Sequence, residues 1–176
     1  MEKIYIGFSR PKKWKAGAAL IMWGEDTPYS HVYVRRESAR VGNYVYQATM
    51  AGGVNFMGMQ IFSNSNEIIK EYEVELTPEQ VLDLVRFFVR NAGREYGFKQ
   101  VLVLGALILA DKLGVDCKNC SNWVINGEEE YICSELGAKI LVDFKGENIN
   151  GLDMVTPRRL DRHMETYYEL SVKGEA

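Results

Sequence analysis

The feature that most constrains the fold is a change of hydrophobic period near residue 77. Before it lie short segments of alternating or β-branched and aromatic residues, which are typical of strands. The sequence Thr77-Pro-Glu-Gln then forms a capping box with proline at the first helical position. Apolar residues afterwards recur at helical spacing, at Val81, Leu84, Val85 and Phe88. Because strands mostly precede helices, we expect an α+β protein with an antiparallel sheet packed against helices.

The expected elements follow from these patterns. We expect strands at 3–9, 30–36 and 43–49, a continuation of the β-rich region through 52–62 and 67–76, and a late strand over 165–172. We expect helices at 12–24, from Pro78 to a stop at Gly93, over a buried apolar run at 101–110, and from about Cys133 onward.

Length, charge and composition limit the classes of function. The chain of 176 residues has no repeat or linker, so we expect a single domain over 1–176. Its formal net charge is −3 with scattered basic residues, which argues against a nucleic-acid partner. The basic stretch at 10–15 is interpreted as a solvated start of a helix rather than a phosphate-binding patch.

Sequence properties also indicate the cellular compartment. The apolar run at 101–110 is about half the length needed to cross a bilayer, so we expect no membrane span. The N-terminus lacks the pattern of a signal peptide, and three cysteines do not suggest a disulfide framework. We therefore expect a cytoplasmic protein, although a phage-encoded or otherwise released protein would have the same properties. The oligomeric state stays open.

Cys133 is the first candidate for chemistry. It begins a segment in which Leu136, Gly137, Ile140 and Leu141 share one helical face. The start of a helix carries unpaired N–H groups and a partial positive charge, which favour a thiolate. Gly137, which lacks a Cβ, would allow a neighbouring strand to approach closely. The alternative is that Cys133 is a small buried apolar residue.

Two residues in the expected strands are candidates for the base and for the group that orients it. Within 30–36, Val32 and Val34 share the face expected to meet the core, which leaves His31 on the opposite face. Gln47 lies in the next expected strand, where its amide oxygen can accept a hydrogen bond from the imidazole and orient the ring. Both could instead be ordinary polar residues of a sheet surface.

Three other residues are assigned no catalytic role. His163 lies in a charged segment and is expected to be solvated. Cys117 and Cys120 form a Cys-x-x-Cys pair in a polar stretch, which we interpret as loop thiols rather than as a disulfide or half of a zinc site. We therefore expect no metal ion.

The sequence resembles the circularly permuted, NlpC-type papain-like amidases and peptidases (the YaeF/YiiX-like group). Residues 133–136, Cys-Ser-Glu-Leu, are similar to the family's nucleophile motif, and residues 30–32, Ser-His-Val, to the start of its histidine strand. Gln47 falls where the family has its third polar residue, and Tyr96 and the segment 155–160 also match. The resemblance covers roughly residues 4–160, with histidine before cysteine as in the permuted group.

The resemblance implies a permuted papain-like fold with the nucleophile at a helix N-terminus and acyl transfer without a cofactor. Cys133 would attack, His31 would transfer the proton and Gln47 would orient the ring. Tyr96, Ser134 and backbone N–H groups at the helix start are candidates for oxyanion or substrate contacts.

The family pattern leaves the substrate open. Ile132 and Glu135 replace an aspartate and a glycine of the family pattern, and the third residue is an amide. The expected substrate is a peptide, cell-wall peptide or γ-glutamyl-type amide. The alternatives are a lipid ester or thioester, as in relatives of the lecithin:retinol acyltransferase kind, or a papain-like module that only binds a ligand.

Overall fold

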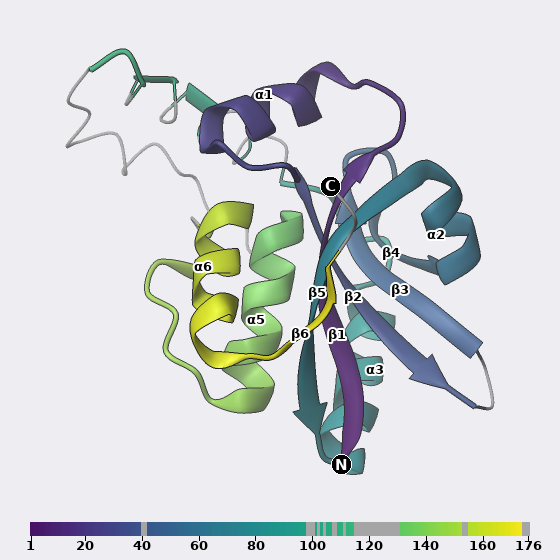
Figure 1. Ribbon diagram of the computed structural model, residues 1–176. Coiled ribbons are helices and arrows are strands. Elements are labelled where there is room, and N and C mark those ends of the chain that lie inside the picture. Colours follow the sequence, from purple (N-terminus) through teal and green to yellow (C-terminus); the bar gives the residue numbers. More distant parts are fainter. Residues whose placement is uncertain are drawn as a thin grey trace.

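The computed structural model describes residues 1–39, 42–97, 101, 103, 105–106, 109–110, 112–114, 131–152 and 155–173. This part of the chain forms an antiparallel sheet of six strands in the order β4-β3-β2-β1-β5-β6, with helices on both faces (Figure 1). The strands are β1 (Glu2–Pro11), β2 (His31–Ser38), β3 (Gly42–Thr49), β4 (Gly53–Gly58), β5 (Asn66–Leu76) and β6 (Leu170–Lys173). The helices are α1 (Ala16–Glu25), α2 (Met59–Ser65), α3 (Pro78–Asn91), α5 (Cys133–Lys145) and α6 (Pro157–Tyr167). The expected α+β class and antiparallel sheet are confirmed.

The two faces of β2 enter two separate clusters of buried side chains. Val32 and Val34 belong to the main core, which also includes buried residues of α3, α5 and α6. Tyr33, on the opposite face, packs with Val45 of β3 and Phe62 of α2 in a smaller cluster. Figure 1 shows α5 and α6 on one side of the sheet and α2 on the other. The expectation that the two valines face the core is confirmed.

Gly137 allows α5 to pack closely on the sheet, as its missing Cβ predicts. A Cβ at this position would lie 3.0 Å from both the Val32 Cγ1 and Leu160 Cδ2 atoms. Both neighbouring side chains are fully buried, so they have little room to move. This close packing holds the start of α5 beside the start of β2.

The helix that begins after Thr77 follows its sequence signals. The Gln80 backbone N–H donates to Thr77 Oγ1 at 3.2 Å, and the Thr77 backbone N–H donates to Gln80 Oε1 at 2.8 Å. The helix ends at Asn91, and Gly93 then adopts a left-handed conformation with φ of 83°. The late strand expected over 165–172 is confirmed only in its second part, since α6 extends to Tyr167 and β6 then pairs with β5.

Two helical segments were not expected from the sequence. The β-rich reading of 52–62 is wrong after Gly58, because α2 begins at Met59 and buries Phe62 against Tyr33. The helix α6 follows a Thr-Pro signal like that of α3, in which Thr156 Oγ1 accepts from the backbone N–H of Arg159 at 3.3 Å. The short α2 and the charged α6 both lack the sustained helical spacing of apolar residues by which the helix after Thr77 was recognised.

Two expected helices differ in extent or burial. The helix expected at 12–24 begins only at Ala16, after Lys15 in an extended conformation. Within 101–110 the described residues are helical but half-buried or exposed, so the expected burial is wrong for them. Among the described residues, none of the helices has both the length and the apolar character needed to cross a membrane.

Candidate active site

Cys133 is the first residue of α5, as expected for a nucleophile at a helix N-terminus. Its side chain is 6% exposed, and the preceding residue, Ile132, has the extended conformation of an N-cap. The segment before it is held by a parallel bridge between Tyr131 and Tyr96. The thiol therefore lies where the unpaired N–H groups of the first turn converge.

His31 is the first residue of β2 and is held by Gln47 of β3. The imidazole Nε2 atom lies 2.8 Å from Gln47 Oε1. Because an amide oxygen only accepts, Nε2 carries the hydrogen and Nδ1 is left to interact with the sulfur of Cys133. The structure thus brings the three predicted catalytic residues together in the order sulfur, imidazole, amide.

Asn55 orients Gln47 and was not identified from the sequence. The Gln47 side chain is 3% exposed, and its amide nitrogen donates to Asn55 Oδ1 at 3.2 Å. Asn55 in turn donates from Nδ2 to Thr49 Oγ1 at 3.1 Å and to the Gly53 carbonyl oxygen at 2.9 Å. Because the Asn55 oxygen accepts from the Gln47 amide nitrogen, the Gln47 side chain is held with its oxygen toward His31. Asn55 lies directly opposite Gln47 in the pairing of β3 with β4. The sequence could have identified Asn55 only if the register of these two strands had been known.

Tyr96 approaches the sulfur from a segment that follows α3. The Val54 backbone N–H donates to the Arg94 carbonyl oxygen at 2.9 Å, which attaches this segment to the edge of β4. Gly53 makes the approach possible, because a Cβ there would lie 2.0 Å from that oxygen. The Tyr96 hydroxyl forms a hydrogen bond with Cys133, and burial together with the thiol's charge raises the pKa of Tyr96 above its ordinary value. A tyrosine held neutral in this way is a hydrogen-bond donor.

The thiol and the imidazole shift each other's ionisation. Burial opposes a thiolate and by itself would raise the pKa of Cys133. This effect is outweighed by the hydrogen bond and charge of His31, by the Val32 backbone N–H and by the Tyr96 hydroxyl, so the pKa of Cys133 is lowered. Burial likewise opposes an imidazolium, and the charge of Lys15 also acts to lower the pKa of His31. The hydrogen bond and charge of Cys133, together with the hydrogen bond to Gln47, outweigh both effects and raise this pKa. Both shifts favour a thiolate–imidazolium pair.

Ser134 forms a structural contact next to the nucleophile. Its hydroxyl donates to the Val155 carbonyl oxygen at 2.5 Å, and the residue is almost fully buried. This bond ties α5 to the segment that leads into α6. A contact between Ser134 and a substrate stays a prediction.

One further expectation is wrong, and one further buried polar residue, Ser9, was not identified from the sequence. His163 is half-buried and paired with Glu147, so the expectation that it is solvated is wrong. Ser9 of β1 lies directly opposite His31, fully buried, and its hydroxyl has no hydrogen-bond partner among the described residues. Residues on paired strands that face each other share a face of the sheet, so Ser9 flanks the imidazole on the side away from Gln47.

A pocket of about 350 Å³ opens beside Tyr96. It is lined by Met50, Gly53, Gly93, Arg94, Glu95 and Tyr96. Tyr96 is the lining residue that also interacts with Cys133, whereas Cys133, His31 and Gln47 do not themselves line the pocket.

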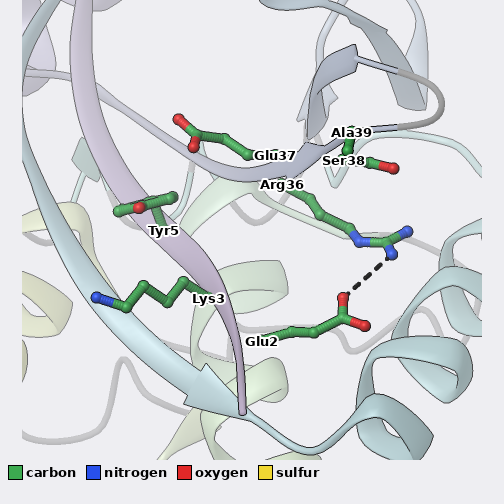
Figure 2. A pocket seen from close by; sticks show the side chains of 7 residues that line it. All are labelled: Glu2, Lys3, Tyr5, Arg36, Glu37, Ser38 and Ala39. Atoms are coloured by element: carbon green, nitrogen blue, oxygen red, sulfur yellow. Dashed lines mark hydrogen bonds and ion pairs between the residues drawn. The ribbon is translucent and has the colours of Figure 1, made fainter.

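A second pocket, of about 590 Å³, lies at the opposite ends of β1 and β2 from Ser9 and His31 (Figure 2). Charged side chains dominate its lining, with Arg36 bonded to Glu2 at 3.2 Å. Its lining residues contain neither cysteine nor histidine, so they cannot supply the same nucleophilic chemistry.

Among the described residues, no three histidine, cysteine, aspartate or glutamate side chains are grouped as metal ligands. Cys117 and Cys120 lie outside the described residues, so the interpretation of them as loop thiols stays a prediction. The sequence matches no protein-family model, and its comparison with curated proteins gives no significant match.

Proposed function

We propose that this protein is a cysteine-dependent hydrolase that cleaves an amide bond through a thiol acyl-enzyme. The observation that carries the proposal is the contact series Cys133–His31–Gln47, in which a helix-start thiol meets an imidazole oriented by a buried amide. The antiparallel sheet, the cysteine helix packed on it and the order of histidine before cysteine support a circularly permuted papain-like fold of the NlpC type.

The proposed reaction has two steps. The Cys133 thiolate attacks the carbonyl carbon, and His31 gives its proton to the departing amine as the carbon–nitrogen bond breaks. Water then attacks the thioester while His31 takes a proton from it, and the thiolate is released with the acid product. In both steps, backbone N–H groups at the start of α5 and the Tyr96 hydroxyl would donate to the oxyanion; the position of Cys133 at the helix start and the interaction of Tyr96 with Cys133 support these roles. The mechanism needs no metal or organic cofactor.

The first substrate class that we propose is a peptide, cell-wall peptide or γ-glutamyl-type amide. An acyl ester or thioester of a lipid is the second candidate, favoured by the exposed apolar side chains of α1, the helix that connects β1 to β2. A papain-like module without catalysis is the alternative from another class. A module that only binds a ligand would not require the lowered pKa of Cys133 together with the raised pKa of His31.

The test is hydrolysis by the unaltered chain and by Cys133→Ser. The substrates are fluorogenic γ-glutamyl and peptide amides and, separately, acyl esters and thioesters. We expect amide cleavage that Cys133→Ser abolishes while its melting temperature stays close to that of the unaltered chain, because one small buried atom is exchanged. Cleavage of esters alone would favour the second candidate. Equal activity of both proteins on every substrate would overturn the role of Cys133.

A further inference from the structure

The helix α1 is apolar around its whole circumference and yet exposed. Residues 16–23 carry no charged or polar side chain, and Glu25 is the one buried residue of the helix. Its neighbour Trp14 is 80% exposed, and Trp23 and Leu20 within the helix are 55% and 50% exposed. An apolar helix of this kind is normally covered, so its exposure calls for an occupant.

The charges around α1 indicate what that occupant is. Lys12, Lys13 and Lys15 are exposed at its N-terminal end. At its other end Lys112 lies over the Trp23 ring, 4.6 Å from the ring centroid, and donates to the Trp23 carbonyl oxygen at 2.7 Å. The three lysines at the N-terminal end form a local concentration of positive charge in a chain whose net charge is −3, whereas at the other end the exposed Asp26 offsets Lys112. Lysines beside exposed tryptophans match a surface with anionic groups above an apolar layer.

We propose that α1 docks on the surface of an anionic lipid bilayer. The helix has ten residues, about half of what a membrane span requires, so it lies on the surface and does not cross it. Trp14 and Trp23 enter the boundary between headgroups and acyl chains, where tryptophan is favoured. Lys12, Lys13 and Lys15 meet the anionic headgroups.

The position of α1 relates this surface to the cysteine. The helix connects β1 to β2, and β2 begins at His31, six residues after Glu25. Figure 1 shows α1 at one end of the molecule, beyond the ends of the strands that it joins. The short segment that follows α1 leads directly into His31, so the docking surface and the candidate active site are close along the chain. A docked molecule therefore holds the site close to the membrane.

The experiment is sedimentation of the full chain with lipid vesicles. Vesicles of phosphatidylcholine with phosphatidylserine are compared with vesicles of phosphatidylcholine alone, at low and high salt. We expect binding to the anionic vesicles that salt weakens. A lysine near an anionic surface contributes roughly fivefold in partitioning, so Lys12→Gln, Lys13→Gln and Lys15→Gln together should weaken binding roughly a hundredfold.

Matched variants separate the apolar contribution from general effects. Leu20→Ser should weaken binding, whereas Leu82→Ser on α3, at a position equally 50% exposed, should not. Cys133→Ser should bind as well as the unaltered chain, so docking is tested independently of catalysis. Quenching of tryptophan fluorescence by brominated acyl chains, measured on the unaltered protein, gives a second readout that needs no variant.

Several results would overturn the proposal. These are equal binding to neutral and anionic vesicles, no quenching by brominated lipid, or the same loss of binding for Leu82→Ser as for Leu20→Ser. Self-association that Leu20→Ser abolishes, without binding to vesicles, would assign α1 to an interface between two copies of the chain.

Discussion

Replacing Gln47 with alanine tests the proposed role of the amide most specifically. In the structure Gln47 Oε1 accepts from His31 Nε2 at 2.8 Å, at a position almost fully shielded from water. A hydrogen bond to a charged group contributes about 1.5–3 kcal/mol. Since one pKa unit corresponds to about 1.4 kcal/mol, Gln47→Ala should lower the pKa of His31 by roughly one to two units.

The consequence is a smaller population of the thiolate–imidazolium pair. The alkaline limb of the activity profile, where the imidazolium loses its proton, should move to lower pH. Because a less charged imidazole also stabilises the thiolate less, turnover at neutral pH should fall by about tenfold to a hundredfold. Gln47→Glu is the matched comparison, because it keeps an acceptor, adds a negative charge and should move the alkaline limb to higher pH.

The assay is the rate of Cys133 labelling by iodoacetamide as a function of pH, beside a thermal melt. A Cys117→Ser, Cys120→Ser background removes the labelling of the other thiols. If Gln47 were only a structural residue, Gln47→Ala would lower the melting temperature and leave the labelling profile where it was. That result would refute the reasoning.

Three further substitutions test how the site is built. Tyr96→Phe removes a donor to the sulfur, so the half-point of Cys133 labelling should move to higher pH with little change in melting temperature. An unchanged profile would exclude Tyr96 from the site's electrostatics. Gly53→Ala should destabilise the fold by more than about 1–2 kcal/mol, because φ is 55° and the added Cβ would meet the Arg94 carbonyl oxygen. A denaturant melt that shows no loss would contradict the close approach. Ser9→Ala removes a buried hydroxyl without a partner among the described residues, so the protein should melt at the same temperature or higher. A clear loss of stability would mean that the hydroxyl does have a partner.

Local signals predicted the elements that local chemistry determines. The capping box at Thr77 and the stop at Gly93 each depend on residues close in sequence, and the structure has both. The helix start at Cys133 was predicted in the same way from its apolar face. By contrast, α2 was missed because its short sequence, Met59–Ser65, continues the composition of the strand before it.

The site was predictable up to the point where strand register became necessary. His31 and Gln47 were selected as polar residues of neighbouring strands, and the structure pairs them by a hydrogen bond. Asn55 and Ser9 complete the surroundings, but only the register places them opposite Gln47 and His31. His163 was misjudged because its partner, Glu147, approaches from a loop that no pattern in the sequence connects to it.

The central claim is that Cys133 is held as a thiolate by His31. The most direct measurement is the pH at which labelling of Cys133 by iodoacetamide reaches half its maximal rate, in the Cys117→Ser, Cys120→Ser background. The lowered pKa of Cys133 predicts a half-point below the ordinary pKa of cysteine, about 8.5, and His31→Ala should move it upward. A half-point at or above the ordinary value, unchanged by His31→Ala, would show that Cys133 is a buried core thiol and would contradict the account.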